Sequence, residues 1–387
     1  MNQLDGKSNS GIGRVLITGG AGFIGSHLAQ SLVDRGITVT VLDNLSQQVH
    51  GADGRSSTAE AIRDCTRFLQ GDVRDRQVVE EACADQDAVV HLAAETGTGQ
   101  SMYEIERYVD VNVRGTSVVL DVLSAAKKKV RKLVVASSRA VYGEGSYRCD
   151  EHGIVYPESR RDEDLAAGDF EVKCPTCGEN VVCVPTDETA KLHPSSVYGI
   201  TKLSQEQLVM ATGLAAGFPV TALRYQNVYG PGQSLSNPYT GILAIFSTRI
   251  LNGNDVQIFE DGTESRDFVF VKDVVEATVR ALENPAADHE IFGVGTGEPT
   301  SVVTVAETLR DAYERDSTIA VNGRYRLGDI RHNYADMTKI QSKLDFRPQW
   351  NFRRGIAEFV AWVQGQSVPE DVSNRSLAEM AAKGLYK

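Results

Sequence analysis

One stretch near the N-terminus constrains the fold more than any other. Residues 14–18 are apolar and β-branched, and residues 26–35 have the spacing of an amphipathic helix that ends before Gly36. A second apolar run, 38–42, ends at Asp43. Between the first run and the helix lies a glycine-rich turn, Gly19-Gly20-Ala21-Gly22-Phe23-Ile24-Gly25. This order predicts a strand, a tight turn, a helix and a second strand, which is the start of a parallel α/β sheet.

The same residues predict a dinucleotide site. Glycines let the backbone turn sharply and approach a pyrophosphate, whose negative charge meets the positive end of the helix. Asp43, at the end of the second strand, is placed to accept hydrogen bonds from the adenosine ribose. Because a carboxylate there repels a 2′-phosphate, we expect NAD rather than NADP.

Composition excludes several classes of protein. The 387 residues carry 40 Lys and Arg against 52 Asp and Glu, a net charge of −12, which disfavours nucleic-acid binding. No apolar run reaches the ~18–20 residues that span a bilayer. Residues 1–13 have no apolar core, so we expect no signal peptide and a cytoplasmic protein.

The alternation of strands and helices continues along the chain. Apolar runs at 66–70, 87–94 and 132–136 are predicted strands, and 220–231 is a predicted strand and turn. The amphipathic stretch 103–129 is a predicted helix ending in three lysines. The fold class is therefore α/β, a doubly wound Rossmann sheet. Small residues Ala93 and Ala94 would let the chain pass close to the cofactor.

Two further patterns, a pair of serines at a strand end and a Tyr-Lys pair on a helix, indicate chemistry at a hydroxyl-bearing carbon. The run 132–136 delivers Ser137 and Ser138 to the carboxyl end of a strand, where ligands bind in open α/β sheets. Tyr198 and Lys202 are four residues apart and share one helical face. A phenol acts as a base near neutral pH only if its anion is stabilised, and a lysine one turn away supplies that charge.

These motifs together resemble the extended branch of the short-chain dehydrogenase/reductases, the NAD-dependent nucleotide-sugar epimerases and dehydratases, over about residues 12–360. The resemblance implies that Ser138, Tyr198 and Lys202 are catalytic. It implies further cofactor contacts at Phe23, Ile24, Asn44, Asp72, Val73, Leu92, Asn112, Tyr198, Lys202 and Tyr225. It also implies that a nucleotide-diphosphate sugar, dTDP- or UDP-linked, is bound by Ser138, Arg139, Tyr198, Asn227, Arg266 and Arg326, with Arg331 and His332 as open candidates. Family members commonly pair through the helix at 103–129 and the helix of Tyr198, so the resemblance implies a homodimer.

The residues after Ser138 separate the reactions of this family. Related 4,6-dehydratases carry Thr-Asp-Glu where this chain has Ser138-Arg139-Ala140, so the acid and base that eliminate water are missing. We therefore expect an epimerase that oxidises C4, lets the sugar rotate and reduces it from the other face; oxidation at C2 or C3 stays open. A dehydratase, a 4-keto-sugar reductase and a non-catalytic NAD-binding regulator are the alternatives, and the presence of both Tyr198 and Lys202 disfavours the last.

The stretch between Ser138 and Tyr198 is longer than in ordinary family members and holds four cysteines. Cys149, His152, Cys174 and Cys177 form two short knuckles with the spacing of a zinc ribbon, and four ligands without an open position predict a structural zinc. Cys183 stays open as a replacement for His152. A cysteine-bearing insert at this point resembles one subset of the family, the dTDP-L-rhamnose 4-epimerases.

The domain organisation follows from these assignments. We expect an NAD-binding Rossmann domain over residues 1–228, interrupted by a zinc-ribbon-like insertion at 146–191. Residues 229–365 are expected to be mainly a nucleotide-sugar-binding domain, with part of 262–296 returning to the first domain. Residues 366–387 form a tail with a short predicted helix over 376–383 and no assignable role.

Overall fold

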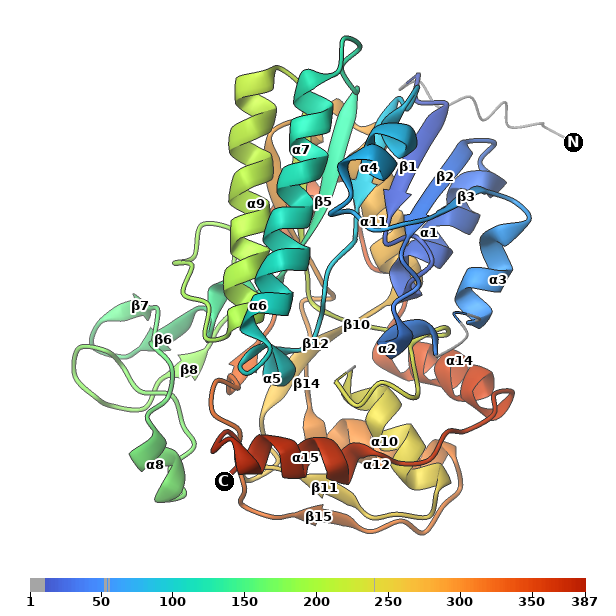
Figure 1. Cartoon of the computed structure of the whole chain (residues 1–387). Coiled ribbons are helices and arrows are strands. Elements are labelled where there is room, and N and C mark those ends of the chain that lie inside the picture. Colours follow the sequence, from blue (N-terminus) through green and yellow to red (C-terminus); the bar gives the residue numbers. More distant parts are fainter. Residues whose placement is uncertain (1–10, 52–53, 55, 240) are drawn as a thin grey trace, which may run out of the picture.

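A parallel sheet of seven strands forms the centre of the molecule, in the order β13-β9-β5-β4-β1-β2-β3 (Figure 1). The computed structural model describes residues 11–51, 54, 56–239 and 241–387; residues 1–10, where no signal peptide is expected, lie outside it. The predicted doubly wound α/β fold is confirmed. The strands are β1 (Arg14–Thr18), β2 (Thr38–Asp43), β3 (Arg67–Gln70), β4 (Ala88–His91), β5 (Lys132–Ser138), β9 (Val220–Tyr225) and β13 (Glu290–Val294).

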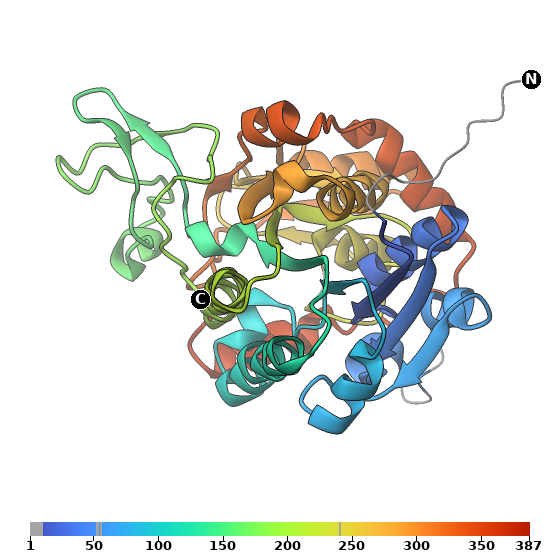
Figure 2. The same cartoon turned by 90° about the horizontal axis from the view of Figure 1, so that it is seen from above.

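Helices cover both faces of this sheet, which is why its central strands are apolar along their whole length (Figure 2). One face packs against α1 (Phe23–Asp34), α3 (Ser57–Arg63), α11 (Val271–Glu283) and α13 (Thr338–Leu344). The other packs against α4 (Arg76–Cys83), α7 (Gly115–Ala125) and α9 (Val197–Ala216). The carboxyl ends of β1, β2, β4 and β5 therefore open at one edge of a rigid, two-sided core.

The predicted helix at 103–129 is confirmed over residues 105–125, but it contains a π-helical turn that the sequence does not indicate. Its parts are α6 (Ile105–Tyr108), the π turn (Val109–Arg114) and α7, which ends at Ala125. Asn112 lies in the π turn, and its side chain bonds the backbone of Glu95 at both its N–H and its carbonyl oxygen. The three lysines at 127–129 lie beyond the helix, and Lys128 pairs with Asp87 instead.

A smaller layer lies beneath the carboxyl edge of the large sheet (Figure 1). Its aromatic core includes Tyr229, Phe270 and Phe359. Its strands are β10 (Asn227–Tyr229), β11 (Val256–Ile258), β12 (Ser265–Phe270), β14 (Pro299–Ser301), β15 (Ile319–Val321) and β16 (His332–Asn333). Its helices are α10 (Ile242–Leu251), α12 (Val302–Ala312), α14 (Phe352–Gln364) and α15 (Ser373–Ala382).

The insertion projects from one side of the molecule near the start of α9 (Figures 1 and 2). It consists of a small antiparallel sheet, in the order β7-β6-β8, and one short helix. These elements are β6 (Tyr147–Cys149), β7 (Gly153–Val155), β8 (Val182–Cys183) and α8 (Asp162–Ala166). Among the described residues, no helix is long and apolar enough to cross a membrane.

Candidate active site

A cavity of about 580 Å³ lies at the carboxyl edge of the large sheet. It is lined by the turn before α1, the ends of β2, β4 and β5, the start of α9 and a loop over 232–237. Most of the predicted cofactor residues line it, namely Gly19, Gly22, Phe23, Ile24, Gly25, Asp43, Asn44, Val73, Leu92, Ala93, Ala94, Tyr198, Lys202 and Tyr225. Asp72 and Asn112 are the two that do not.

The glycines of the first turn have distinct geometric roles. Gly19 has a φ of 70°, and a Cβ there would lie 2.7 Å from the backbone nitrogen of Ala93. A Cβ at Gly25 would lie 2.5 Å from the carbonyl oxygen of Gly19, so both positions exclude a side chain. Gly22 is the N-cap of α1, and no side chain caps this helix end. The first turn of α1 therefore presents open backbone N–H groups at the cavity, as binding of a pyrophosphate requires.

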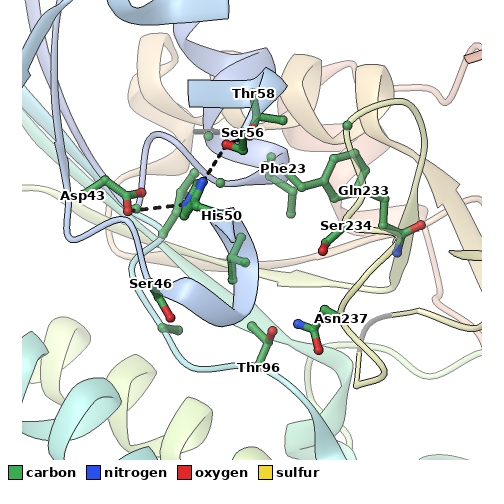
Figure 3. A pocket seen from close by; sticks show the side chains of 18 of the residues that line it. Phe23, Asp43, Ser46, His50, Ser56, Thr58, Thr96, Gln233, Ser234 and Asn237 are labelled. Atoms are coloured by element: carbon green, nitrogen blue, oxygen red, sulfur yellow. Dashed lines mark hydrogen bonds and ion pairs between the residues drawn. The ribbon is translucent and has the colours of Figure 1, made fainter. Parts of the chain in front are cut away.

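Asp43 is buried at the end of β2, and its carboxylate is held from several sides (Figure 3). Its two oxygens accept hydrogen bonds from the N–H groups of Ala21, at 3.0 Å, and Leu45, at 2.9 Å. His50 Nε2 lies 3.7 Å from the carboxylate, and His50 Nδ1 lies 2.7 Å from the Ser56 hydroxyl. Burial lowers the pKa of His50, against the opposing charge of Asp43, so a neutral imidazole is favoured.

His50 and Ser56 were not identified from the sequence, because neither belongs to a motif. In Figure 3 they lie beside Asp43, across the cavity from Gln233, Ser234 and Asn237. The two sides come from segments almost two hundred residues apart. No local pattern in the sequence indicates that they meet.

Asp72 and Asn112, the two predicted cofactor residues that do not line the cavity, form hydrogen bonds with residues next to it. Asp72 accepts hydrogen bonds from Asn44, at 3.0 Å, and from Arg74, at 2.7 and 2.8 Å. The hydrogen bonds from Arg74 lower the pKa of Asp72 to about 2, so this side chain is an anion. Asn112 is fully buried and also donates to the Thr201 hydroxyl, at 2.9 Å, which ties the π turn to α9.

Ser138, Tyr198 and Lys202 all line this cavity. Ser138 ends β5, and Tyr198 and Lys202 occupy the first turns of α9. Burial raises the pKa of Tyr198, while a hydrogen bond with Ser138 and the positive charge of Arg139 act in the opposite direction. Burial also lowers the pKa of Lys202 to about 7, against the charge of Glu206. Lys202 Nζ donates to Gln205 Oε1 at 2.6 Å. Tyr198 and Ser138 are thus hydrogen-bonded to each other, and Lys202 lies one helical turn further along α9 at the same cavity.

A buried ion pair lies directly behind this group. Arg224 on β9 donates two hydrogen bonds to Glu206, at 2.6 and 3.0 Å, and both side chains are 2% exposed. Glu206 also accepts the hydroxyl of Ser137, at 2.6 Å, and Arg224 donates to the Tyr142 hydroxyl, at 2.9 Å. The pair therefore connects α9 and β9 to the strand that carries Ser138.

A second cavity, of about 210 Å³, begins next to Ser138 and is lined by Arg139, Asn227, Arg266 and Arg326. Arg266 donates to the backbone carbonyls of Ser265, Ile330 and Arg331, whereas Arg326 pairs with Asp329 at 2.7 Å. Within the described residues, neither Arg139 nor Arg266 has a carboxylate partner. The cavity lining also includes Glu260, Glu264 and Asp329, but the arginines outnumber these acids. Because Arg139 and Arg266 form no ion pair with a carboxylate, their guanidinium groups suit an anionic ligand.

The two open candidates at 331 and 332 lie outside both cavity linings. Arg331 is fully buried and pairs with Glu260, at 3.0 Å, and with Asp261, at 2.6 Å. His332 lies 2.9 Å from the Ser265 hydroxyl, and burial lowers its pKa to about 4. Both hold the β12–β16 region in place from behind the second cavity.

Four of the insertion's side chains gather where the sequence predicts a metal. One ligand atom from each of Cys149, His152, Cys174 and Cys177 lies within 4.8 Å of the others. Close approaches join Cys149 Sγ to His152 Nδ1, at 3.5 Å, and Cys149 Sγ to Cys177 Sγ and Cys174 Sγ to His152 Nδ1, both at 3.7 Å. Cys183 lies in β8 outside this cluster, with its thiol facing the carbonyl oxygen of Val184.

The insertion contacts the wall of the second cavity through ion pairs between charged side chains. Arg160, whose side chain is 4% exposed, donates two hydrogen bonds to Glu260, at 2.8 Å each, and one to the carbonyl oxygen of Asp329, at 3.0 Å. Arg331 pairs with Glu171 of the insertion at 2.7 Å. Because Glu260 and Asp329 line the second cavity, the insertion supports one wall of it.

Comparison with known proteins places these features in one family. The family model described as "NAD dependent epimerase/dehydratase family" matches residues 15–161 and 175–295. A dTDP-L-rhamnose 4-epimerase of Burkholderia thailandensis is 38% identical over 93% of this chain and 96% of its own. A UDP-N-acetyl-alpha-D-glucosaminuronate decarboxylase of Bacillus cytotoxicus is 31% identical over 90% of this chain and 97% of its own. The crystal structure of a UDP-glucose 4-epimerase from Thermotoga maritima with UDP-glucose is similar with a TM-score of 0.75 and 31% identity, covering 91% of this chain and 99% of that one.

Proposed function

Because the chain belongs to the NAD-dependent epimerase/dehydratase family, we propose that it is a nucleotide-sugar 4-epimerase. The observation that carries the proposal is the junction of the two cavities. Ser138 and Tyr198 line the first, and Arg139 and Asn227 line the second. A sugar bound through an anionic group in the second cavity would present its hydroxyl to the catalytic residues of the first.

The residues beside Ser138 favour epimerisation over loss of water. A dehydratase of this family carries an acid and a base there, and this chain has Arg139 and Ala140. Neither side chain takes up or releases a proton in the neutral range. A reductase would need exchangeable NADPH, and the buried carboxylate of Asp43 opposes a 2′-phosphate.

The chemistry assigns one task to each side chain. NAD, when bound, supplies the group that oxidises the sugar carbon and then reduces it from the opposite face. Tyr198 Oη takes the proton of the substrate hydroxyl and returns it after the sugar has turned. Ser138 Oγ holds the substrate oxygen, and the Lys202 ammonium stabilises the phenolate and contacts the cofactor.

The residues of the first cavity fit NAD. Its glycine turn and uncapped helix end suit the pyrophosphate, and Asp43 suits the ribose. We assign Asp72 to the adenine end of NAD, where it positions Asn44. We assign Asn112 to the nicotinamide end, where it positions the backbone of Glu95. NAD is regenerated in each turnover and stays tightly bound.

The substrate is proposed to be a dTDP- or UDP-linked sugar, with dTDP-L-rhamnose as the leading candidate. The 38% identical relative supports this candidate, because the similarity extends over nearly the whole of both chains. Arg266, Arg326 and Asn227 bind the diphosphate, and Arg139 binds beside the sugar. In this division, residues 1–228 with part of 262–296 hold NAD, and residues 229–365 hold the substrate.

We also propose that the insertion holds one structural zinc ion through Cys149, His152, Cys174 and Cys177. The support is the ligand set itself, four soft donors from two knuckles on a segment with a very small apolar core. A closed set of four protein ligands leaves no position for a substrate, so the metal stabilises the fold of the insertion and takes no part in the reaction.

A homodimer through α6, the π turn and α9 is proposed as the working assembly. Its support is a group of apolar side chains exposed on these neighbouring elements, at Ile105, Val109 and Ile200. Such side chains are normally covered by a partner when they cluster on adjacent helices. We assign the protein to the cytoplasm, where the nucleotide sugar and reduced thiols are both available.

The test is incubation of the purified protein with a panel of dTDP- and UDP-linked sugars, without added cofactor, followed by NMR. We expect inversion at C4 of one substrate and no dependence on added NADPH. Formation of a 4-keto-6-deoxy sugar would instead assign the protein to the dehydratases of the family. Protein heated to unfold its NAD-binding domain is the control for non-enzymatic change.

A further inference from the structure

The C-terminal residues 371–387, which we call the strap, lie against the second cavity. Their helix α15 crosses beneath the carboxyl edge of the large sheet and beside α10 (Figure 1). Four of its side chains line the cavity: Ser373, Ser376, Leu377 and Met380. They follow the spacing of one helical face, and the residues of the opposite face, such as Ala378 and Ala381, are exposed.

The first end of the strap is fixed to a buried arginine that itself lines the cavity. Arg249 on α10 donates to the Ser373 hydroxyl, at 2.5 Å, and to the side-chain oxygen of Asn374, at 3.0 Å. It also pairs with Asp371 at 3.2 Å, and Asp371 accepts a hydrogen bond from Asn254 at 2.9 Å. A charged, buried anchor of this kind keeps the helix in one position.

The other end pairs with the segment that carries Arg326. The N–H groups of Tyr325 and Leu327 donate to the carbonyl oxygens of Lys387 and Leu385, both at 3.0 Å, and Lys387 N–H donates back to Tyr325 at 3.0 Å. Between the two ends, Met380 is buried against Gly99, which also lines the cavity. The strap is thus tied on both sides to residues that face the ligand space.

We propose that the strap is a part of the substrate site and that its inner face contacts the nucleotide portion of the bound nucleotide sugar. This inference rests on the proposed function, because it takes the ligand of the second cavity to be a nucleotide sugar. The sugar must reach Ser138, which lies at the Arg139 end of the cavity. The diphosphate then meets Arg266 and Arg326, and the nucleoside extends to the wall that the strap and α10 form.

One hydroxyl and two flexible apolar side chains suit such a wall. The Ser376 hydroxyl donates to the carbonyl oxygen of Ser373 at 2.8 Å and can still accept a hydrogen bond from a base or ribose. Leu377 and Met380 offer apolar contact to the flat face of a base. The Ser373 hydroxyl is occupied by Asp371 and Arg249 and fixes the helix. The strap therefore determines which nucleotide is accepted, whereas the residues around Ser138 determine the reaction.

A matched pair of substitutions on neighbouring residues tests the proposal. Leu377→Trp places an indole inside a cavity of about 210 Å³, and Ala378→Trp places the same group on the exposed face of the same helix. Binding of UDP and of dTDP is measured by isothermal titration calorimetry. We expect Leu377→Trp to weaken nucleotide binding about 5- to 100-fold, the range set by overpacking a filled site. Ala378→Trp should bind as the parent does.

Two further measurements keep the result interpretable. NAD released by denaturing each variant should equal that of the parent, because Leu377 does not line the first cavity. Amide hydrogen exchange of the unmodified protein tests the strap without any substitution, and residues 373–383 should become more protected when UDP or dTDP is added.

The outcomes separate the strap from the proposed function. Equal nucleotide affinity in the two tryptophan variants, or unchanged exchange in 373–383 while a nucleotide binds, would overturn the role of the strap. Failure of the parent protein to bind either nucleotide would contradict the nucleotide-sugar substrate itself. Slowed exchange together with selective weakening in Leu377→Trp supports both.

Discussion

The buried pair of Glu206 and Arg224 allows a quantitative prediction about the catalytic strand. Both side chains are 2% exposed, and two hydrogen bonds of 2.6 and 3.0 Å join them. Glu206→Gln removes the negative charge but keeps the shape of the side chain. The Arg224 guanidinium then stays buried without a counter-ion. In addition, the amide NH₂ group of the glutamine replaces an oxygen that accepted a hydrogen bond, so it faces another donor, either Arg224 or the Ser137 hydroxyl.

The cost follows from the burial of the pair. Removing one partner of a buried ion pair costs about 3–5 kcal/mol, a large part of the roughly 5–15 kcal/mol that stabilises a typical domain. The control is Glu81→Gln, the same substitution in a pair with Arg67 that has a distance of 2.8 Å and side chains 48% and 60% exposed. There we expect a loss below about 1 kcal/mol.

The assay is urea unfolding of the cofactor-free protein, followed by circular dichroism at fixed pH and salt. Glu206→Gln should lower the midpoint with an unchanged slope, and Glu81→Gln should barely move it. If the two substitutions cost the same free energy within about 1 kcal/mol, the buried pair is not an essential support of the strand that carries Ser138. That result would refute the reasoning.

Three further outcomes follow from the site. Tyr198→Phe should lower kcat by about 10²- to 10⁴-fold and leave NAD bound, so a variant with full turnover would remove Tyr198 from the role of base. Metal analysis should give about one zinc per chain for the parent and for Cys183→Ser, but a clear loss for Cys177→Ser; equal zinc in both variants would exclude the proposed ligand set. The pKa of Lys202 is about 7 in the folded protein against a usual value of 10.5, so the unfolded chain binds more protons above pH 7. The free energy of unfolding of the cofactor-free parent, minus that of Lys202→Met, should therefore rise from pH 7 to 9, by at most about 1.4 kcal/mol per pH unit. If urea unfolding gives a difference that does not change with pH, Lys202 is not a buried lysine with a lowered pKa.

The parts of the site that are local in the sequence could be predicted from it. The turn Gly19–Gly25 is required by backbone geometry, because Gly19 has a positive φ and a side chain at Gly25 would strike the backbone. Tyr198 and Lys202 need only one helical face, and the four metal-cluster residues need only two short knuckles. Each of these patterns lies within a few residues, so it can be recognised without knowing how the rest of the chain packs.

The remaining parts depend on contacts between distant segments. His50 beside Asp43 and the four charges around Arg331 belong to no motif, and each depends on how separate segments pack together. The π turn within the predicted helix at 103–129 has a similar origin, because it places Asn112 against the backbone of Glu95. Apolar periodicity cannot detect it.

The strap lies between these two cases. Its helix was predicted from 376 to 383, and the structure places it at Ser373–Ala382. The spacing of Ser373, Ser376, Leu377 and Met380 is a helical face visible in the sequence, but two serines in that face do not indicate a buried surface. Only the packing against α10 shows that a cavity lies beneath it.

The central claim is that one hydrogen leaves the sugar carbon and returns to the same carbon from the other face. It is tested most directly with the accepted nucleotide sugar carrying deuterium at C4, converted in ordinary water without added cofactor and analysed by NMR and mass spectrometry. We predict that the inverted product keeps the deuterium at C4 and gains none elsewhere. Loss of the label to solvent with inversion would contradict the account, because the carbon would then have been deprotonated rather than oxidised.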